Sequence, residues 1–362
     1  DPGREAEEEE SYHYYLPAVE GSYGAEKTFN DRLAGEAGTE VIRVDASGFK
    51  HETVKGREPV QGQDIALTLD FRIQRLVEEA LGDDCGAAVV LDPRNGDVLA
   101  MGSSPAFDPN RFAAGLSREE WAELTSGESH PMLNRALQGV YPPGSTFKPV
   151  VAIAALESGS AAANTRFNCP GYFQLGSVRF HCWQKDGHGS LALIKGIEQS
   201  CNAYFCQLGL QCGPDRIVAV ARSAGLGSPT GLDLGSELGL EAGGVVPDRA
   251  WKMKRYKEGW WPGDTCNLSI GQGALAATPL QMSLLTATIA NGGFVYRPRM
   301  LLPPGQKGDL LRKVTWSRET LRVVRGGMRD VVQMETGTGK RAQVAGVDMA
   351  GKTGTAEFGI KT

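Results

Sequence analysis

A serine and a lysine three residues apart, Ser145 and Lys148, stand in the stretch YPPGSTFKPV of residues 141–150. A serine hydroxyl becomes an effective nucleophile when a neighbouring base removes its proton, and an uncharged lysine amine can serve as that base. The two side chains could therefore act together as a nucleophile and its base. The same spacing also has a plain structural explanation, because Ser145 could be a helix N-cap, and it recurs at Ser47 and Lys50 in a polar stretch.

The residues that follow predict a helix that begins at Ser145. From Val150 to Leu156 apolar residues fall on every side of the chain, which is typical of a buried helix. Pro149 is tolerated only in a first turn, where backbone N–H groups lack partners in any case. Because positions three apart share one face of a helix, we expect Ser145 and Lys148 to meet at the mouth of a buried element.

Two further motifs occur once each in the chain. The stretch QSCNAYF contains a Ser-x-Asn motif, and AGKTGTAE contains a Lys-Thr-Gly motif. Their residues are Ser200 and Asn202, then Lys352, Thr353, Gly354 and Thr355. The order Ser-x-x-Lys, Ser-x-Asn, Lys-Thr-Gly is the signature of active-site serine enzymes that react with penicillin.

With these motifs the chain resembles the class B penicillin-binding proteins, and the elongation type, penicillin-binding protein 2, is the most similar. The resemblance covers roughly residues 60–362 and includes GDTCNLSIGQG, TPLQM and LDPRNGDVLAMGSSPAFDPNRF. It implies an α+β fold shared with serine β-lactamases, in which helices flank an antiparallel sheet and form a helical subdomain. It also implies a DD-transpeptidase that cross-links peptidoglycan stem peptides during cell-wall elongation and is a target of β-lactams.

The resemblance assigns a role to each motif. Ser145 would attack the D-Ala-D-Ala bond, Lys148 would act as the base, and Ser200 would pass a proton. Asn202 would hold the substrate amide, and Lys352 would face the substrate carboxylate, with the hydroxyls of Thr353 or Thr355 assisting. The backbone N–H groups of Ser145 and Thr355 would form the oxyanion hole. No cofactor is expected for this chemistry.

The role of Lys148 requires a lowered pKa, because a free lysine amine has a pKa near 10.4. Lowering it by about 3 units corresponds to roughly 4 kcal/mol. Burial and a second cation such as Lys352 both favour the uncharged amine. Repulsion of about 4 kcal/mol between two unit charges a few Å apart is enough to supply that shift.

A separate set of side chains has the types that bind zinc. Cys169, Cys182, His188 and Cys201 are separated by 12, 5 and 12 intervening residues, and thiolate and imidazole are the usual ligands of structural zinc. The alternative is that Cys169 and Cys182 are buried thiols or a disulfide, with His188 an ordinary loop residue. Since some elongation-type relatives hold zinc in this loop, the resemblance extends a structural zinc to these four positions.

Composition limits the function classes further. The 362 residues include 43 acidic and 38 basic side chains, a net charge of −5, and this balance gives no electrostatic footprint for nucleic acid. No run of 18 apolar residues occurs, so no stretch of the sequence predicts a membrane span. Residues 1–15 read as an acidic linker or tail, residues 16–62 as a partial pedestal, and residues 63–362 as the transpeptidase domain, shortened at its C-terminal end.

Because the chain starts at Asp1 without a signal sequence, we expect a membrane anchor upstream, in the inner membrane, with the catalytic domain in the periplasm or extracytoplasmic space. The expected partners are peptidoglycan stem peptides, β-lactams and a membrane glycosyltransferase of the elongation complex. No nucleic-acid partner is expected.

Local patterns predict the elements around these motifs. The stretch AEKTFNDRLAG predicts one short helix, TEVIRVDASG a strand, and residues 71–82 a helix with an apolar stripe. Two apolar runs flank Asn95-Gly96, which favours a hairpin with a tight primed turn. Thr278 and Pro279 predict the start of a helix that ends at Gly292 or Gly293.

Three alternative functions fit parts of the sequence. GVDMAGKT, residues 346–353, matches a phosphate-binding loop literally, but a helix must follow such a loop and Gly354 comes next. A serine β-lactamase or β-lactam sensor would use the same STFK motif, although residues 16–62 resemble a transpeptidase pedestal. The third alternative is a non-enzymatic scaffold of the wall-building complex, which the intact motifs disfavour.

Overall fold

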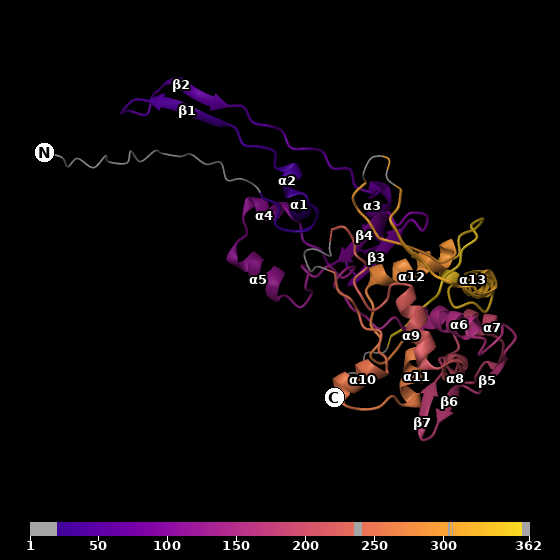
Figure 1. The fold of residues 1–362 in the computed structure, drawn as a ribbon. Helices are drawn as coiled ribbons and strands as arrows, with labels where there is room; N and C mark the ends of the chain where they lie inside the picture. The colour runs from indigo at the N-terminus through magenta and orange to yellow at the C-terminus, as the bar shows by residue number, and fades with distance from the viewer. Residues whose placement is uncertain (1–19, 235–240, 303–304, 306, 357–362) are drawn as a thin grey trace. The chain divides into compact units, whose positions relative to one another are not determined.

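The computed structural model describes residues 20–234, 241–302, 305 and 307–356 (Figure 1). Its contacts divide the chain into two units. The first unit contains the residues up to Ile65 together with Pro109–Gly115, and the second contains Ala66–Asp108 and the residues from Leu116 onward. The acidic tail predicted for residues 1–15 lies outside the described residues, and the domain boundary at residue 62 stays a prediction.

The first unit is built from short helices and one hairpin. Its elements are α1 (Gly24–Thr28), α2 (Asn30–Leu33), the antiparallel strands β1 (Thr39–Val44) and β2 (Lys50–Arg57), and α4 (Asn110–Ala114). The single helix predicted here is therefore wrong. At Phe29 the backbone dihedrals of −113° and 20° leave the helical range, and this residue separates α1 from α2.

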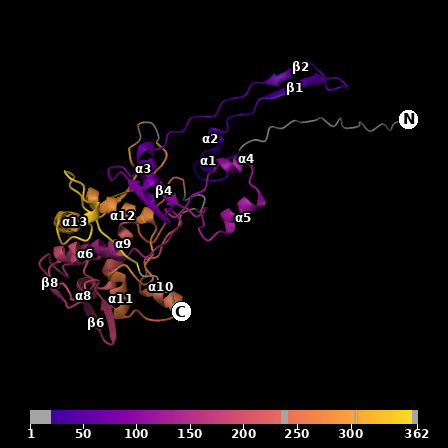
Figure 2. The same cartoon turned by 180° about the vertical axis from the view of Figure 1, so that it is seen from behind.

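The second unit contains most of the helices. They are α3 (Phe71–Leu81), α5 (Arg118–Ser126), α6 (Lys148–Glu157), α7 (Leu193–Glu198), α8 (Asn202–Cys212), α9 (Pro214–Ser223), α10 (Arg249–Tyr256), α11 (Pro262–Ser269), α12 (Pro279–Asn291) and α13 (Arg318–Gln333), with short 3₁₀ turns η1 (Gly144–Phe147) and η2 (Lys340–Ala342). Figure 2 shows the same helices from behind. Among the described residues, no helix is both long and apolar enough to cross a membrane.

The strands of the second unit pair as antiparallel hairpins or short ladders. They are β3 (Gly86–Leu91) with β4 (Val98–Ser104), β5 (Phe167–Cys169) with β8 (Gly189–Leu191), β6 (Tyr172–Leu175) with β7 (Val178–His181), and β9 (Phe294–Tyr296) with β10 (Leu310–Lys313). Helix α3 packs against β4, and α12 packs against β3. This arrangement confirms the expected α+β class with antiparallel pairing.

The β3–β4 hairpin forms as predicted, but its turn differs. A two-residue primed turn needs positive φ at both central residues, whereas Gly96 has φ of 83° and Asn95 is not in the positive region. The Asp92 carboxylate accepts the backbone N–H of Arg94 at 2.9 Å, and the Asp92 carbonyl accepts that of Gly96 at 3.0 Å. The side chain of Asp92 therefore organises a longer loop.

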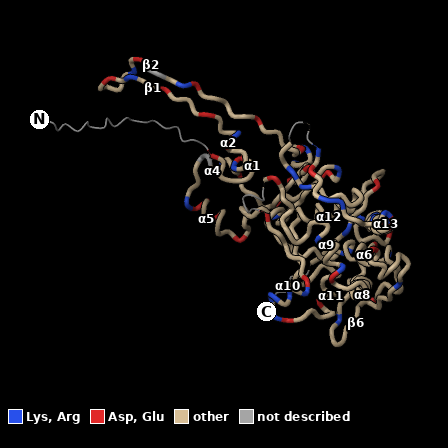
Figure 3. Tube along the Cα trace, viewed as in Figure 1, with Lys and Arg blue, Asp and Glu red and all other residues tan. Residues whose placement is uncertain are grey.

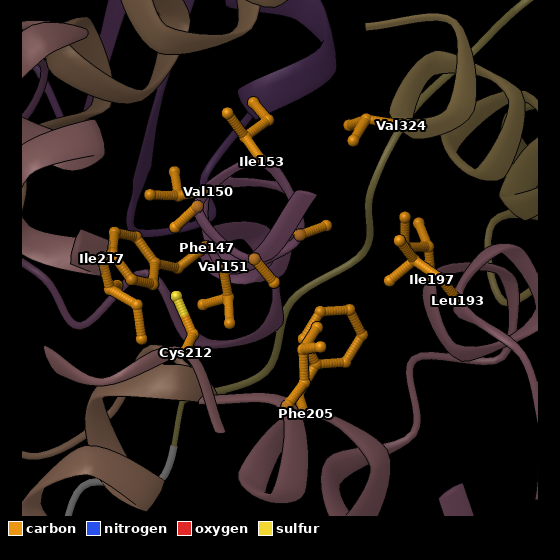
Figure 4. Close-up of a cluster of buried hydrophobic side chains, with 14 of the residues drawn as sticks. Phe147, Val150, Val151, Ile153, Leu193, Ile197, Phe205, Cys212, Ile217 and Val324 are labelled. Carbon is orange, nitrogen blue, oxygen red and sulfur yellow. The ribbon is translucent and has the colours of Figure 1, made fainter. Parts of the chain in front are cut away.

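Helix α6 lies at the centre of the apolar core, as its sequence predicts. Val150, Val151 and Ile153 are completely buried, and the helix contacts α7, α8, α9 and α13. Figure 4 shows Phe205, Ile217 and Val324 from the surrounding helices around these side chains. Burying each such side chain contributes roughly 1.5–3 kcal/mol, so the element that carries Lys148 is rigidly held.

The helix predicted after Thr278 is confirmed. Thr278 and Gln281 form a reciprocal capping box, and Gly292 ends α12 in the left-handed conformation with φ of 97°. Helix α3 begins at Phe71 as predicted and ends at Leu81, one residue before the predicted end, and its apolar stripe is only partly covered, since Leu76 is 60% exposed. Basic and acidic residues are both scattered over the described chain (Figure 3).

Candidate active site

Ser145 lies in the 3₁₀ turn that leads directly into α6. Gly144 before it has φ of 55°, and its N–H donates to the Gly271 carbonyl at 2.8 Å. A Cβ on Gly144 would lie 2.5 Å from the Thr355 carbonyl, and one on Gly271 would lie 1.9 Å from the Gly144 carbonyl. The two glycines thus let three backbone segments meet at the serine.

Lys148 is completely buried one turn beyond Ser145. Its Nζ donates to the Ser200 carbonyl at 2.7 Å and to Asn202 Oδ1 at 2.7 Å, and Ser200 Oγ lies 3.3 Å away. The Phe205 ring lies below the amine, with its centroid 5.5 Å from Nζ. Burial lowers the pKa of Lys148 to about 8, which brings the uncharged amine within reach near neutral pH.

The expected direct pairing of Ser145 with Lys148 is not formed in the structure. In the part of the chain that the structure describes, the Ser145 hydroxyl has no hydrogen-bond partner. The Lys148 amine is instead oriented by Ser200 and Asn202. Catalytic hydrogen bonds are often long or poorly aligned before substrate binds. The missing hydrogen bond between Ser145 and Lys148 is therefore compatible with Lys148 as the base.

Ser200 joins the two lysines. Its Oγ accepts a hydrogen bond from Lys352 Nζ at 2.7 Å and lies 3.3 Å from Lys148 Nζ. Its backbone has φ of 53°, which is uncommon for a residue other than glycine. Burial, followed by the charge of Lys148, lowers the pKa of Lys352 to about 7. The Ser200 hydroxyl therefore contacts two lysine amines, those of Lys148 and Lys352, and both have a lowered pKa.

The Lys-Thr-Gly segment runs beside the serine turn. A Cβ on Gly354 would lie 2.8 Å from Cγ2 of Thr146, so glycine allows this close approach. The Thr353 hydroxyl is 2.7 Å from that of Thr338, and it supports the segment. The backbone N–H groups of Ser145 and Thr355 have no partner among the described residues, as an oxyanion hole requires.

The literal match to a phosphate-binding loop has no structural support. Gly351 donates its N–H to the Met328 carbonyl at 2.9 Å, and the described residues 352–356 are not helical. A phosphate-binding loop needs a helix N-terminus after its lysine. Lys352 here instead points its amine at Ser200.

Glu198 and its partners were missed by sequence reasoning. The Glu198 side chain is fully buried two residues before Ser200, and it accepts from the Thr336 hydroxyl and pairs with Lys195 Nζ at 2.6 Å. The Glu198 carbonyl accepts the Thr338 N–H at 3.4 Å. Through Thr338 the Ser-x-Asn loop is linked to Thr353. A lone glutamate in a short helix gives no sequence signal for this link.

The four proposed zinc ligands come together. The ligand atoms of Cys169, Cys182, His188 and Cys201 all lie within 4.8 Å of one another. His188 Nδ1 is 3.6 Å from Cys169 Sγ and 3.5 Å from Cys182 Sγ, and the sulfurs of Cys182 and Cys201 are 3.9 Å apart. Tetrahedral zinc with ordinary bond lengths places its ligands about 3.5–3.8 Å apart. The donor set therefore fits zinc.

The electrostatics of this cluster favour a thiolate. A hydrogen bond from Cys201 lowers the pKa of the Cys182 thiol. None of the three cysteines forms a disulfide, and all three are buried. His188 Nε2 is buried and has no hydrogen-bond partner among the described residues, which leaves Nδ1 as the nitrogen that faces the sulfurs.

The cluster also touches the catalytic motif. Asn202 Nδ2 donates to the His181 carbonyl at 3.0 Å, immediately before Cys182. Trp183 Nε1 donates to the Gln199 carbonyl at 2.8 Å. Cys201 itself stands between Ser200 and Asn202. Order in the cysteine loop is therefore transmitted directly to the residues that orient Lys148.

Together these contacts assemble a serine at a helix start, two amines of lowered pKa and two free backbone N–H groups. Such a site can form a serine ester with a carbonyl compound, stabilise the oxyanion and move the displaced proton. Lys352 is available for a substrate carboxylate, whose negative charge would favour the protonated amine. Gln272 lies in the stretch GDTCNLSIGQG that carries the family resemblance, although no role was predicted for it, and its Nε2 donates to the Thr355 carbonyl at 3.2 Å.

Two protein families match the chain. The penicillin binding protein transpeptidase domain matches residues 86–362. The penicillin-binding protein dimerisation domain matches residues 2–67.

Individual relatives agree with this assignment. The chain is 39% identical to peptidoglycan D,D-transpeptidase MrdA of Acinetobacter baumannii over 347 residues, which are 93% of this chain and 51% of that protein. Its identity to the protein of that name from Escherichia coli K12 is 37%, over 94% of this chain and 55% of the relative. The chain thus spans about half the length of the curated relatives it matches.

A solved structure has the same fold. In the complex between penicillin-binding protein 2 and MreC from Helicobacter pylori, the matching chain is 34% identical to this one, with a TM-score of 0.82. The match covers 94% of this chain and 63% of that chain.

Proposed function

Because the chain belongs to the penicillin-binding protein transpeptidase family, we propose that it is a peptidoglycan D,D-transpeptidase of cell-wall elongation. One observation carries the proposal: Ser200 Oγ lies between Lys148 and Lys352, so that all three motifs converge beside Ser145. The substrate would be the D-Ala-D-Ala end of a stem peptide. The arrangement suits a substrate that offers both a carbonyl to attack and a terminal carboxylate to bind.

In the first half-reaction, the Ser145 oxygen forms an ester with the carbonyl carbon of the penultimate D-Ala. The peptide C–N bond breaks, and the last D-Ala leaves with the proton that Lys148 has taken from Ser145, either directly or through the Ser200 hydroxyl. Lys352 binds the substrate carboxylate, and the N–H groups of Ser145 and Thr355 bind the oxyanion. Asn202, which already orients Lys148, offers its remaining amide hydrogen to the substrate backbone.

In the second half-reaction, an amine of a neighbouring stem peptide attacks the ester, and the Ser145 oxygen recovers its proton. Slow reaction of the ester with water distinguishes this enzyme from the alternative, a serine β-lactamase or β-lactam sensor of the same fold. A transpeptidase requires the acyl group to wait for an amine.

The rate at which the penicillin ester is hydrolysed distinguishes a transpeptidase from a β-lactamase. We expect a stable adduct of one penicillin per chain that persists for many minutes after excess drug is removed, because water is poorly activated at the ester. Intact-mass spectra over time give the rate of release. Regeneration of free protein within seconds would support the β-lactamase alternative, and a folded protein that never acylates would support the scaffold alternative.

We assign a structural zinc to the cluster formed by Cys169, Cys182, His188 and Cys201. The assignment rests on the types of these ligands and on the distances between their ligand atoms. Bound zinc would hold the loop in place and take no part in the acyl transfer. The energy of metal binding becomes folding energy. The cluster should therefore stabilise both the fold and the orientation of Asn202.

Metal analysis of protein purified without chelator should give about one zinc per chain. Removing the metal should lower Tm and slow penicillin acylation about tenfold, by analogy with the loss of groups that support a metal site. The control is Cys85→Ala, at an exposed cysteine outside the cluster. This variant should keep the zinc content, the Tm and the acylation rate of the unmodified protein. Protein without stoichiometric metal, or a Cys169–Cys182 disulfide found by peptide mapping, would contradict the assignment.

The proposed substrate sets the location and the partners. Peptidoglycan stem peptides lie outside the cytoplasmic membrane, so we place the transpeptidase domain on that side, tethered to the inner membrane. β-Lactams, which mimic the D-Ala-D-Ala end, would acylate the same serine. A membrane glycosyltransferase of the elongation complex is the proposed partner, supported by a similar solved structure described as a peptidoglycan synthase complex that coordinates polymerization and crosslinking.

A further inference from the structure

A cavity of about 250 Å³ lies next to the serine site in the second unit. It is enclosed by α10 with the loop that follows it, by α11, and by residues 272–274. Its side chains are mainly aromatic or polar, and they include Trp251, Tyr256, Trp260, Asp264, Asn267 and Gln272. The acyl-transfer mechanism uses none of these side chains.

The cavity and the serine site share one wall. Gln272 lines the cavity, and its Nε2 donates to the Thr355 carbonyl at 3.2 Å. The adjacent Gly271 carbonyl accepts the Gly144 N–H at 2.8 Å. Gln272 therefore links the cavity to the segment that carries Thr355 beside Ser145.

The aromatic side chains are held in place. The rings of Trp251 and Tyr256 meet edge to face, with centroids 5.6 Å apart. Trp260 Nε1 donates to Thr265 Oγ1 at 2.8 Å. The faces of aromatic rings carry partial negative charge and attract the polarised C–H groups of a ligand. Asn267 adds an amide that has no side-chain partner among the described residues.

Basic residues stand on both sides of the lining residue Tyr256 in the chain. Lys254 and Arg255 in the last turn of α10 and Lys257 directly after the helix are exposed and have no acidic partner in the described part of the chain. Figure 3 shows this basic end of α10. Lys252, in contrast, is paired with Asp264 at 2.5 Å. Three unpaired cations favour a ligand that carries carboxylates.

We propose that the cavity binds an amino-sugar ring of a glycan-linked stem peptide, with the carboxylates of the peptide facing Lys254, Arg255 and Lys257. Pockets with aromatic walls and a few convergent polar groups suit a ring with hydroxyl and amide groups. The inference rests on the proposed function for the identity of the ligand. It adds a subsite that reads the glycan, beyond the peptide end that reacts with Ser145.

The test measures binding of two probes that lack D-Ala-D-Ala and so cannot react. The first is an amino-sugar disaccharide carrying a tripeptide, and the second is the same tripeptide without sugar. Calorimetry with the complete chain should give tighter binding of the sugar-bearing probe. Tyr256→Ala should weaken that binding about tenfold, and Lys254→Gln with Arg255→Gln should weaken it most at low salt. Phe71→Ala, the loss of a 77% exposed aromatic on α3, should have no effect.

Penicillin acylation, measured in parallel, should be the same in Tyr256→Ala and in the unmodified protein. Equal binding of the two probes, or equal binding of the sugar-bearing probe by Tyr256→Ala and the unmodified chain, would overturn the subsite. A fall in acylation that matches the fall in binding would show a structural role for Tyr256. Failure of the unmodified protein to acylate would contradict the proposed function instead.

Discussion

Ser145→Ala should abolish penicillin acylation, with a loss of at least about 10⁴-fold in the rate constant. The substitution removes the only atom that can form the ester, while the helix start, the lysines and the backbone N–H groups remain. Intact mass after penicillin treatment should increase by one whole drug molecule in the unmodified protein, because opening of the β-lactam ring expels no group. The adduct should map to the peptide that contains Ser145.

The matched control is Ser47→Ala. Ser47 also stands three residues before a lysine, but its hydroxyl hydrogen-bonds to Asp45 on an exposed turn of the first unit. The Ser47→Ala variant should be acylated by penicillin at the same rate as the unmodified protein. Persistent labelling of a folded Ser145→Ala variant, with the mass increase on another peptide, would refute Ser145 as the nucleophile.

The contrast between Ser47 and Ser145 shows which parts of the site could be predicted from sequence. Both have lysine at the same spacing, so spacing alone could not choose between them. What distinguishes Ser145 is the run of apolar residues from Val150 onward, which predicts a buried helix, and the two companion motifs. Order along the chain thus identified the participants, and burial of Lys148 at the centre of the core follows from the same apolar run.

The partners of each side chain could not be predicted in this way. Lys148 donates to Ser200 and Asn202, more than fifty residues away, and Thr353 bonds to Thr338. These contacts depend on how helices and loops pack against one another. The types of residues that are far apart in the sequence do not specify that packing. Glu198 is the clearest case, since only its complete burial next to Thr336 reveals a role.

Local backbone predictions failed where a single side chain redirected the chain. At Asn95-Gly96 the sequence favours a primed turn, but the Asp92 carboxylate accepts the Arg94 N–H and organises a longer loop. The helices that follow Asp70 and Thr278 were predicted, the first from its apolar spacing and the second from its cap, its first-turn proline and its terminal glycine. Agreement of independent local signals is what made the second prediction succeed.

Replacing Lys148 should have the second large effect. Lys148→Ala should slow acylation about 10²–10⁴-fold, the usual contribution of a general base. Lys148→Met, which fills the same volume without an amine, should do the same and thereby separate lost chemistry from lost packing. Lys340→Met, at an exposed lysine on η2, is the control and should leave acylation unchanged.

The pH dependence distinguishes Lys148 from Lys352 as the base. The pKa of Lys148 is lowered to about 8, so its amine is mostly protonated below that pH and cannot accept a proton. The acylation rate at saturating penicillin should therefore increase about tenfold between pH 7 and pH 9. In Lys148→Ala the small remaining rate should be nearly constant over that range, whereas Lys352→Ala should keep the increase. A pH step that survives in Lys148→Ala and disappears in Lys352→Ala would assign the base to Lys352, whose pKa of about 7 also permits it.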